Sequence, residues 1–191
     1  MIKSTHPEFE KLIAGNPVNS TLELLDFLDG IGVPYTRQGP VLTLNPGMEL
    51  LDEAAIRTEL QRLVSELQMS TLDLEIHRVT QSTNDVVMQR LVEGQSTAIL
   101  CAAEMQTAGK GRRGRRWISP FGRNVYLTYG RFIGRQLSEL GGLSLVVGMV
   151  VVDVLRAMGL ERVGLKWPND ILLGGGKLGG ILVELRASDA G

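Results

Sequence analysis

Five of the ten residues from 108 to 117 are lysine or arginine, and three more are glycine. Glycine lets a backbone approach a ligand closely and turn its N–H groups toward an anion. Arginine adds permanently charged donors that match phosphate or carboxylate oxygens in pairs. On composition alone the segment could be a phosphate-binding loop, a nucleic-acid patch or a solvated turn. Its charged residues are Lys110, Arg112, Arg113, Arg115 and Arg116.

The positive charge of this segment is local. The 191-residue chain has a net charge of −1 and a pI of about 6.2, whereas nucleic-acid-binding domains usually lie roughly above pI 9. A basic segment on a near-neutral protein favours one local anion over a nucleic acid.

Further stretches could contribute polar groups to the same chemistry. Lys166-Trp167-Pro168-Asn169-Asp170 places a lysine before a proline-directed turn. Lys177 follows three glycines at the start of a strand, where a point charge can be aimed at an anion. Ser82-Thr83-Asn84 begins a helix, and helix N-termini favour anions. Taken singly, each has an ordinary structural explanation as a turn, an exposed charge or a helix cap, and Gln106 could equally be loop surface.

Apolar spacing predicts the elements that position these residues. Ser82 is expected to cap its helix, with Asp85 three residues on in a capping-box position. Residues 143–158 are apolar on nearly all sides, which predicts a buried helix. The predicted helices are 21–28, ended by Gly30, then 51–67, 82–94 and 143–158. The predicted strands are 33–36, 41–44, 74–79, 97–103 and 124–129, with a hairpin of 171–173 and 177–185 turning at 174–176.

Helices and strands mix without a strict βαβ alternation, which predicts an α+β fold. The single cysteine, Cys101, excludes an intrachain disulfide and favours a reducing, cytoplasmic setting. Two distant histidines and one cysteine match no metal-ligand spacing. No apolar run is long enough to span a bilayer. Asn45-Pro46-Gly47 marks the expected boundary between residues 1–46 and 47–191.

Several of these stretches follow one another in a set order. They are Ser82-Thr83-Asn84, Gln106, the loop 108–115, Trp117-x-Ser119-Pro120-x-Gly122-x-Asn124-Val125-Tyr126, Lys166-Trp167-Pro168-Asn169-Asp170 and Lys177-Leu178-x-Gly180-Ile181-Leu182-Val183-Glu184. The series closely resembles the catalytic domain of biotin protein ligases of the bacterial bifunctional ligase/repressor type. The resemblance runs from about residue 47 to the end of the chain.

The resemblance implies a two-step reaction. The carboxylate of biotin attacks the α-phosphate of Mg²⁺-ATP to give biotinyl-5′-adenylate, and biotin then passes to a lysine of a biotin carboxyl carrier protein. The expected fold is a mixed sheet flanked by helices, similar to the core of class II aminoacyl-tRNA synthetases. ATP and Mg²⁺ are expected as co-substrates, without a tightly bound metal.

The resemblance also implies roles for residues. Those expected to be catalytic are Lys177, Arg112 and Lys166. Those expected to bind biotin are Ser82, Thr83, Asn84, Gln106, Gly109, Lys110, Gly111, Arg112 and Lys177. Those expected to bind the nucleotide or adenylate are Arg112, Arg113, Arg115, Trp117, Asn169 and Asp170, although Trp117 could equally be structural.

The chain departs from the family pattern in three places. Lys110 stands where the family usually has arginine, which keeps the charge but loses the bidentate fork. Residues 21–44 resemble only the last helix and wing of a winged helix-turn-helix, so residues 1–46 are expected to be a remnant of such a domain. Glu23 and Asp26 in that helix argue against DNA contact. The strand and small barrel that follow in relatives are missing, so the chain is expected to be truncated at both ends. A lipoate or octanoate ligase, a DNA-binding regulator and a remnant that folds without catalysis stay open as alternatives. A homodimer formed through a sheet edge is a further expectation.

Overall fold

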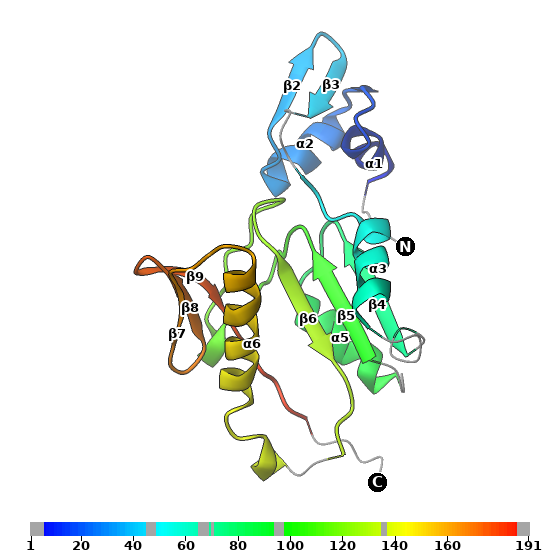
Figure 1. Ribbon diagram of the computed structural model, residues 1–191. Coiled ribbons are helices and arrows are strands. Elements are labelled where there is room, and N and C mark those ends of the chain that lie inside the picture. The colour runs from blue at the N-terminus through cyan, green and yellow to red at the C-terminus, as the bar shows by residue number, and fades with distance from the viewer. Residues whose placement is uncertain are drawn as a thin grey trace. The chain divides into compact units, whose positions relative to one another are not determined.

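The computed structural model describes residues 6–44, 49–64, 69, 71–93, 98–134 and 137–186, whose elements are shown in Figure 1. They fall into two compact units, each of which is described by itself. The first unit comprises residues 1–110 and 116–132, and the second comprises 111–115 and 133–191. The domain boundary expected at residues 45–47 lies outside the described residues.

The first unit begins with a small helix–sheet layer. Its antiparallel strands have the order β1-β3-β2, and its helices pack on them through buried Phe9, Leu24 and Leu28. Phe9 also contacts Phe121 edge to face, with ring centroids 5.3 Å apart. The elements of this layer are α1 (Pro7–Ile13), β1 (Val18–Asn19), α2 (Leu22–Ile31), β2 (Tyr35–Gln38) and β3 (Val41–Leu44).

Helix α2 starts and stops by local rules. The Thr21 hydroxyl accepts a hydrogen bond from the Leu24 N–H at 3.1 Å, which satisfies one donor of the first turn. The expected stop at Gly30 is wrong, because the helix ends at Ile31 and Gly32 takes the left-handed conformation, with φ 67°. A glycine in that conformation is the usual end of a helix, whereas Gly30 fits within the last turn.

The main sheet of the first unit is mixed, as the α+β prediction requires. Strand β4 (Leu72–His77) runs parallel to β5 (Ala98–Ala103), and β6 (Tyr126–Gly130) pairs with β5 antiparallel. Helix α5 (Thr83–Val92) packs on this sheet through Val87, against Ile99 and Cys101 (Figure 1). The helix predicted at 51–67 is confirmed for residues 53–63, which form α3 (Glu53–Leu63). None of the residues of α3 is fully buried.

The described part of the second unit combines the α-helix α6 (Leu143–Ala157) with a three-stranded antiparallel sheet. Helix α6 packs against β7 and β8 through Val152, Val163 and Ile171. Strand β9 forms the expected hairpin with β8, although it ends at Gly180, five residues short of the prediction. The elements are the short 3₁₀ helices η1 (Arg112–Gly114) and η2 (Leu137–Leu140), α6 (Leu143–Ala157), β7 (Val163–Lys166), β8 (Asp170–Leu173) and β9 (Gly176–Gly180).

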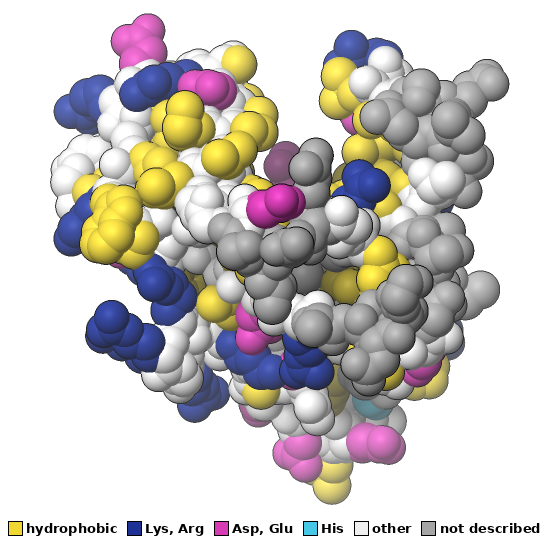
Figure 2. Space-filling view, turned by 90° about the horizontal axis from the view of Figure 1, so that it is seen from below, with side chains coloured by type: hydrophobic (Ala, Val, Ile, Leu, Met, Phe, Trp, Pro, Cys, Tyr) yellow, Lys and Arg dark blue, Asp and Glu magenta, His cyan; other side chains and the backbone are white. Residues whose placement is uncertain are grey.

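The expectation that residues 143–158 form a buried helix is correct for the helix and wrong for its burial. Only Gly148 and Val152 of α6 are buried, whereas Met149 is 60% exposed and Val150 57%. Figure 2 shows hydrophobic side chains at the surface in the view from below. A uniformly apolar sequence therefore packs here along one face only. No helix among the described residues is long and apolar enough to cross a membrane.

Candidate functional site

Gln106 lies where β4 and β5 end and α5 begins. The parallel pairing of the two strands extends beyond them through a bridge between Thr80 and Gln106. Thr80 donates its N–H to Met105 at 3.1 Å, and Thr107 donates its N–H to Thr80 at 2.9 Å. These backbone bonds hold Gln106 beside the first turn of α5.

Gln106 takes over the capping role expected of Ser82. The Gln106 Oε1 accepts the backbone N–H of Thr83 at 2.9 Å and lies 3.1 Å from the Thr83 hydroxyl. Ser82 occupies the N-cap position, is 2% exposed and makes no capping hydrogen bond. The predicted N-cap position of Ser82 is therefore confirmed, although its side chain makes no capping hydrogen bond. A long-range glutamine satisfies the first turn instead.

Two further hydroxyls complete this network, and the sequence did not identify them as site residues. The Gln106 Nε2 donates to Ser119 Oγ at 3.2 Å. The Thr128 hydroxyl lies 2.8 Å from the Thr83 hydroxyl and donates to Asn84 Oδ1 at 2.6 Å. The sequence held one signal for Thr128, because it is a polar residue within a predicted strand that is otherwise mostly apolar.

Gly109 approaches this network too closely for any larger residue. A Cβ atom added there would lie 2.6 Å from the Trp117 carbonyl, 2.8 Å from Ser119 Oγ and 3.2 Å from Gln106 Nε2. The Trp117 N–H also donates to the Gly109 carbonyl at 2.8 Å. Glycine is needed here because backbone and side-chain groups converge on the position where a Cβ would sit. Trp117 is half-buried beside it.

The start of the basic segment is attached to α5. The Ala108 N–H donates to the Gln81 carbonyl at 2.8 Å, and the Lys110 ammonium forms an ion pair with Asp85. Asp85 thus binds a lysine of the loop in place of the capping-box pairing that its position predicted. Ser82, Thr83, Asn84, Gln106, Gly109 and Lys110 all belong to this part of the first unit.

In the second unit, residues 111–115 form a tight turn. The Gly111 N–H donates to the Arg115 carbonyl at 2.7 Å, and Arg113 has a left-handed backbone, with φ 59°. The Arg112 guanidinium donates to Asn169 Oδ1 at 3.0 Å. The side chains of Arg113 and Arg115 are exposed and make no hydrogen bond or ion pair within the described part of the chain.

Asn169 and Asp170 hold two of the expected catalytic cations. The Asn169 Nδ2 donates to the Ile181 carbonyl at 3.0 Å, so both ends of its amide are engaged. The Lys177 ammonium donates to Asp170 Oδ1 at 2.7 Å. Lys166 pairs with Asp170 in the β7–β8 register, and its side chain is exposed. Arg112, Asn169, Asp170 and Lys177 therefore form two neighbouring polar pairs at the start of β8.

A buried ion pair joins Arg78, which follows β4, to Glu104, which follows β5 and precedes Gln106 by two residues. Arg78 and Glu104 are 6% and 2% exposed, and Arg78 donates to Glu104 Oε1 at 3.2 Å. The Leu51 N–H donates to the same oxygen. Burial nevertheless raises the pKa of Glu104 above its usual value, against the attraction of Arg78 and these hydrogen bonds.

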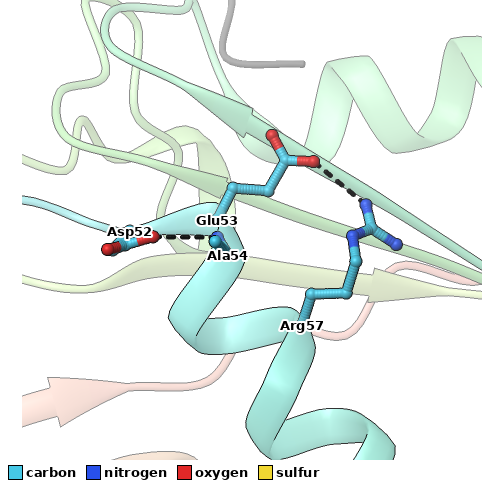
Figure 3. A pocket seen from close by; sticks show the side chains of 4 residues that line it. All are labelled: Asp52, Glu53, Ala54 and Arg57. Atoms are coloured by element: carbon cyan, nitrogen blue, oxygen red, sulfur yellow. Dashed lines mark hydrogen bonds and ion pairs between the residues drawn. The ribbon is translucent and has the colours of Figure 1, made fainter.

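Two further features of the described residues bear on the choice of site. The described residues contain no group of three histidine, cysteine, aspartate or glutamate side chains that could hold a metal ion. A shallow depression at the start of α3 is lined by Asp52, Glu53, Ala54 and Arg57 (Figure 3). Asp52 caps the helix there and Glu53 pairs with Arg57 at 3.0 Å, so its polar groups are already engaged.

Comparison with known proteins identifies the family of this chain. Residues 76–190, which contain the Gln106 network and both polar pairs of the second unit, match the model of the biotin/lipoate A/B protein ligase family. The chain belongs to this family.

Relatives of this ligase family include proteins named bifunctional ligase/repressor BirA. That of Salmonella typhimurium is 40% identical over 151 residues, 79% of this chain and 44% of the relative. That of Escherichia coli is 49% identical over 107 residues, 56% of this chain and 33% of the relative. A crystal structure of biotin protein ligase from Leishmania major with biotinyl-5-AMP aligns with a TM-score of 0.49 and 30% identity, over 60% of this chain and 52% of that chain. The chain thus spans less than half the length of these two BirA relatives.

Proposed function

We propose that this chain carries the biotin-activating chemistry of a biotin protein ligase. In this proposal biotin and Mg²⁺-ATP give biotinyl-5′-adenylate and pyrophosphate, and biotin then passes to a lysine of a biotin carboxyl carrier protein. The observation that carries the proposal is the hydrogen-bonded group Thr83, Gln106 and Ser119, packed around Gly109. The family match supports it, since the matched residues contain this group.

The polarity of the group favours biotin over lipoate within the family. Biotin carries a ureido ring with two N–H donors and one carbonyl acceptor, which must be paired when they are buried. Thr83 and Ser119 are 3% and 5% exposed and bring hydroxyl groups to the site, and Gln106 brings an amide. The dithiolane ring of lipoate has no hydrogen-bonding groups, so it could not use the remaining lone pairs of these hydroxyl and amide groups.

We assign the positive charge that the reaction needs to side chains of the second unit. A carboxylate and a triphosphate repel each other, so fixed positive charge must stabilise the charge that develops between them. We assign this task to Lys177, with Arg112 on the adenylate and Lys166 on the phosphates. Lys177 must then exchange Asp170 for the substrate, and Arg112 keeps Asn169 as its anchor. We also assign the exposed Arg113 and Arg115 side chains to phosphate oxygens and Trp117 to the adenine.

Adenylate formation tests the proposal directly. The chain is incubated with biotin, Mg²⁺ and α-labelled ATP, and the products are separated by thin-layer chromatography beside a full-length relative. Labelled biotinyl-adenylate is the expected product, and calorimetry should show biotin binding more tightly than lipoate. The proposal fails if the relative is active while this chain neither forms the adenylate nor binds biotin. Tighter binding of lipoate would assign the chain to the lipoate branch of the family.

Three parts of the proposal concern the wider protein. The order of α1, α2 and the antiparallel β1–β3 layer supports the view of residues 1–46 as a remnant of a winged helix-turn-helix. The acidic Glu23 and Asp26 on α2 favour a structural role for it over DNA binding. We also propose a cytoplasmic location, which the single cysteine favours. A homodimer is the proposed oligomeric state.

A further inference from the structure

The Thr128 hydroxyl connects two consecutive residues of the first turn of α5. Thr128 lies on β6, opposite Cys101 of β5. Its Oγ1 is 2.8 Å from Thr83 Oγ1 and 2.6 Å from Asn84 Oδ1. One side chain of the sheet thus holds two residues to which the resemblance assigns biotin binding.

The number of available protons sets the direction of these hydrogen bonds. A threonine hydroxyl has one proton and two lone pairs. Thr128 donates its proton to Asn84 Oδ1, so toward Thr83 it can only accept. The alternative acceptor for the Thr83 proton is Gln106 Oε1, which is farther away, at 3.1 Å, and already receives the Thr83 N–H. The shorter contact at 2.8 Å favours a chain from Thr83 to Thr128 to Asn84.

This direction determines what Thr83 can offer to a ligand. Its proton is directed into the protein toward Thr128 or Gln106 in either arrangement, and its remaining lone pair can only accept a hydrogen bond. Thr83 therefore complements an N–H group of a ligand and has no proton for a carbonyl oxygen.

We propose that Thr128 is a positioning residue of the biotin site, which holds the Thr83 hydroxyl with its lone pair toward a ureido N–H. This inference rests on the proposed function, and Thr128 lies outside the motifs that pointed to that function. Thr128 acts through Thr83 and Asn84, without touching the reacting atoms. Its loss should weaken the affinity for biotin and leave the affinity for ATP unchanged.

Calorimetry on the 191-residue chain tests this role with four single variants and one double variant. Thr128→Val removes the hydroxyl, keeps the shape and suits a strand, so biotin should bind about three- to tenfold more weakly, as expected for one lost hydrogen bond. Thr128→Ser restores the hydroxyl and should bind within twofold of the wild type. Thr83→Val should weaken biotin at least as much as Thr128→Val, and the double variant no more than Thr83→Val alone. Thr58→Val, which removes a hydroxyl bonded to Ala54 on α3, should change nothing.

Each contrary outcome has a separate meaning. Unchanged biotin affinity in Thr128→Val, alongside a loss in Thr83→Val, overturns the role of Thr128 and leaves the proposed function standing. Equal losses of biotin and ATP affinity that Thr128→Ser does not restore also overturn it, because they indicate a general structural defect. A wild-type chain that binds no biotin overturns both proposals. Thr128→Ala is measured in the same way if the valine variant does not fold.

Discussion

Lys110 of the basic segment forms an ion pair with Asp85 in the first turn of α5. The two residues lie 25 positions apart in the sequence. The pair fastens the start of the segment to the helix whose first turn also carries Thr83. Lysine at position 110, where the family usually has arginine, thus has a specific partner in this chain.

Asp85→Asn should make the basic segment open more often without unfolding the protein. Trypsin cleaves after the lysine and arginines of residues 110–116, so initial cleavage there should accelerate about two- to fivefold, as expected for an exposed ion pair worth roughly 0.2–1 kcal/mol. Mass spectrometry of the first fragments measures this. Glu59→Gln, which breaks the exposed Arg62–Glu59 pair on α3, should leave this cleavage unchanged. Equal rates in wild type and Asp85→Asn would show that the ion pair does not restrain the segment.

Lys177→Ala should lower the rate of biotinyl-adenylate formation by about a hundredfold or more, the usual effect of removing a group that stabilises developing charge. Its stability should change by less than about 1 kcal/mol, because the Lys177–Asp170 pair is partly exposed. Labelled adenylate and a urea melt measure the two effects. Lys11→Ala, which breaks the exposed Lys11–Glu8 pair, is the matched control. An undiminished rate in Lys177→Ala would remove Lys177 from the catalytic assignment.

The raised pKa of Glu104 predicts a pH dependence of stability. Because burial raises this pKa above the usual 4.5, the folded chain binds the proton more tightly than the unfolded chain. Glu104 therefore contributes stability that is fully present below pH 4.5 and is lost as the pH rises through the raised pKa.

Glu104→Gln mimics the protonated form and should become progressively more stable than the wild type as the pH rises through this window. Urea melts of both chains at several pH values measure the difference in unfolding free energy. Exposed Glu59→Gln supplies the baseline for an uninvolved carboxylate. A difference between wild type and Glu104→Gln that stays constant with pH would argue against the raised pKa.

Gly130→Ala should destabilise the first unit by about 1–3 kcal/mol through overpacking. A Cβ at Gly130 would lie 2.2 Å from Val87 Cγ1, where α5 packs against β6. Gly164→Ala is a matched substitution in strand β7, where a Cβ meets nothing within 4 Å. Urea unfolding compares the two. Equal stability of both variants would mean that α5 shifts away from β6 without cost.

Local patterns of the sequence identified most of the elements that the structure describes. Hydrophobic periodicity found α5, α6 and the strands β4, β5, β6 and β8, because each repeats a pattern within a few residues, but it did not find β7. It did not find α1, whose short helix begins at Pro7, nor the exposure of one face of α6. Periodicity describes which faces of an element are apolar, and burial also depends on which neighbours cover them.

The contacts within the site were less accessible. The motifs pointed to Thr83 and Gln106, which do meet, and to Arg112 and Asn169, which also meet. They did not reveal that Gln106 caps α5 in place of Ser82. Neither Thr128 nor the partner of Lys110 follows from spacing, because their contacts join residues 25 to 45 positions apart, which only tertiary structure brings together.

Cys101 lies in the centre of β5, between β4 and β6, and has no exposed surface. Because it is the single thiol of the chain, its rate of labelling can report how often the main sheet opens. A thiol reagent can label it only when the strand is uncovered. The labelling rate in native buffer would therefore measure how often this sheet opens. Slower labelling with biotin present would show that the ligand stabilises β5, the strand that leads to Gln106.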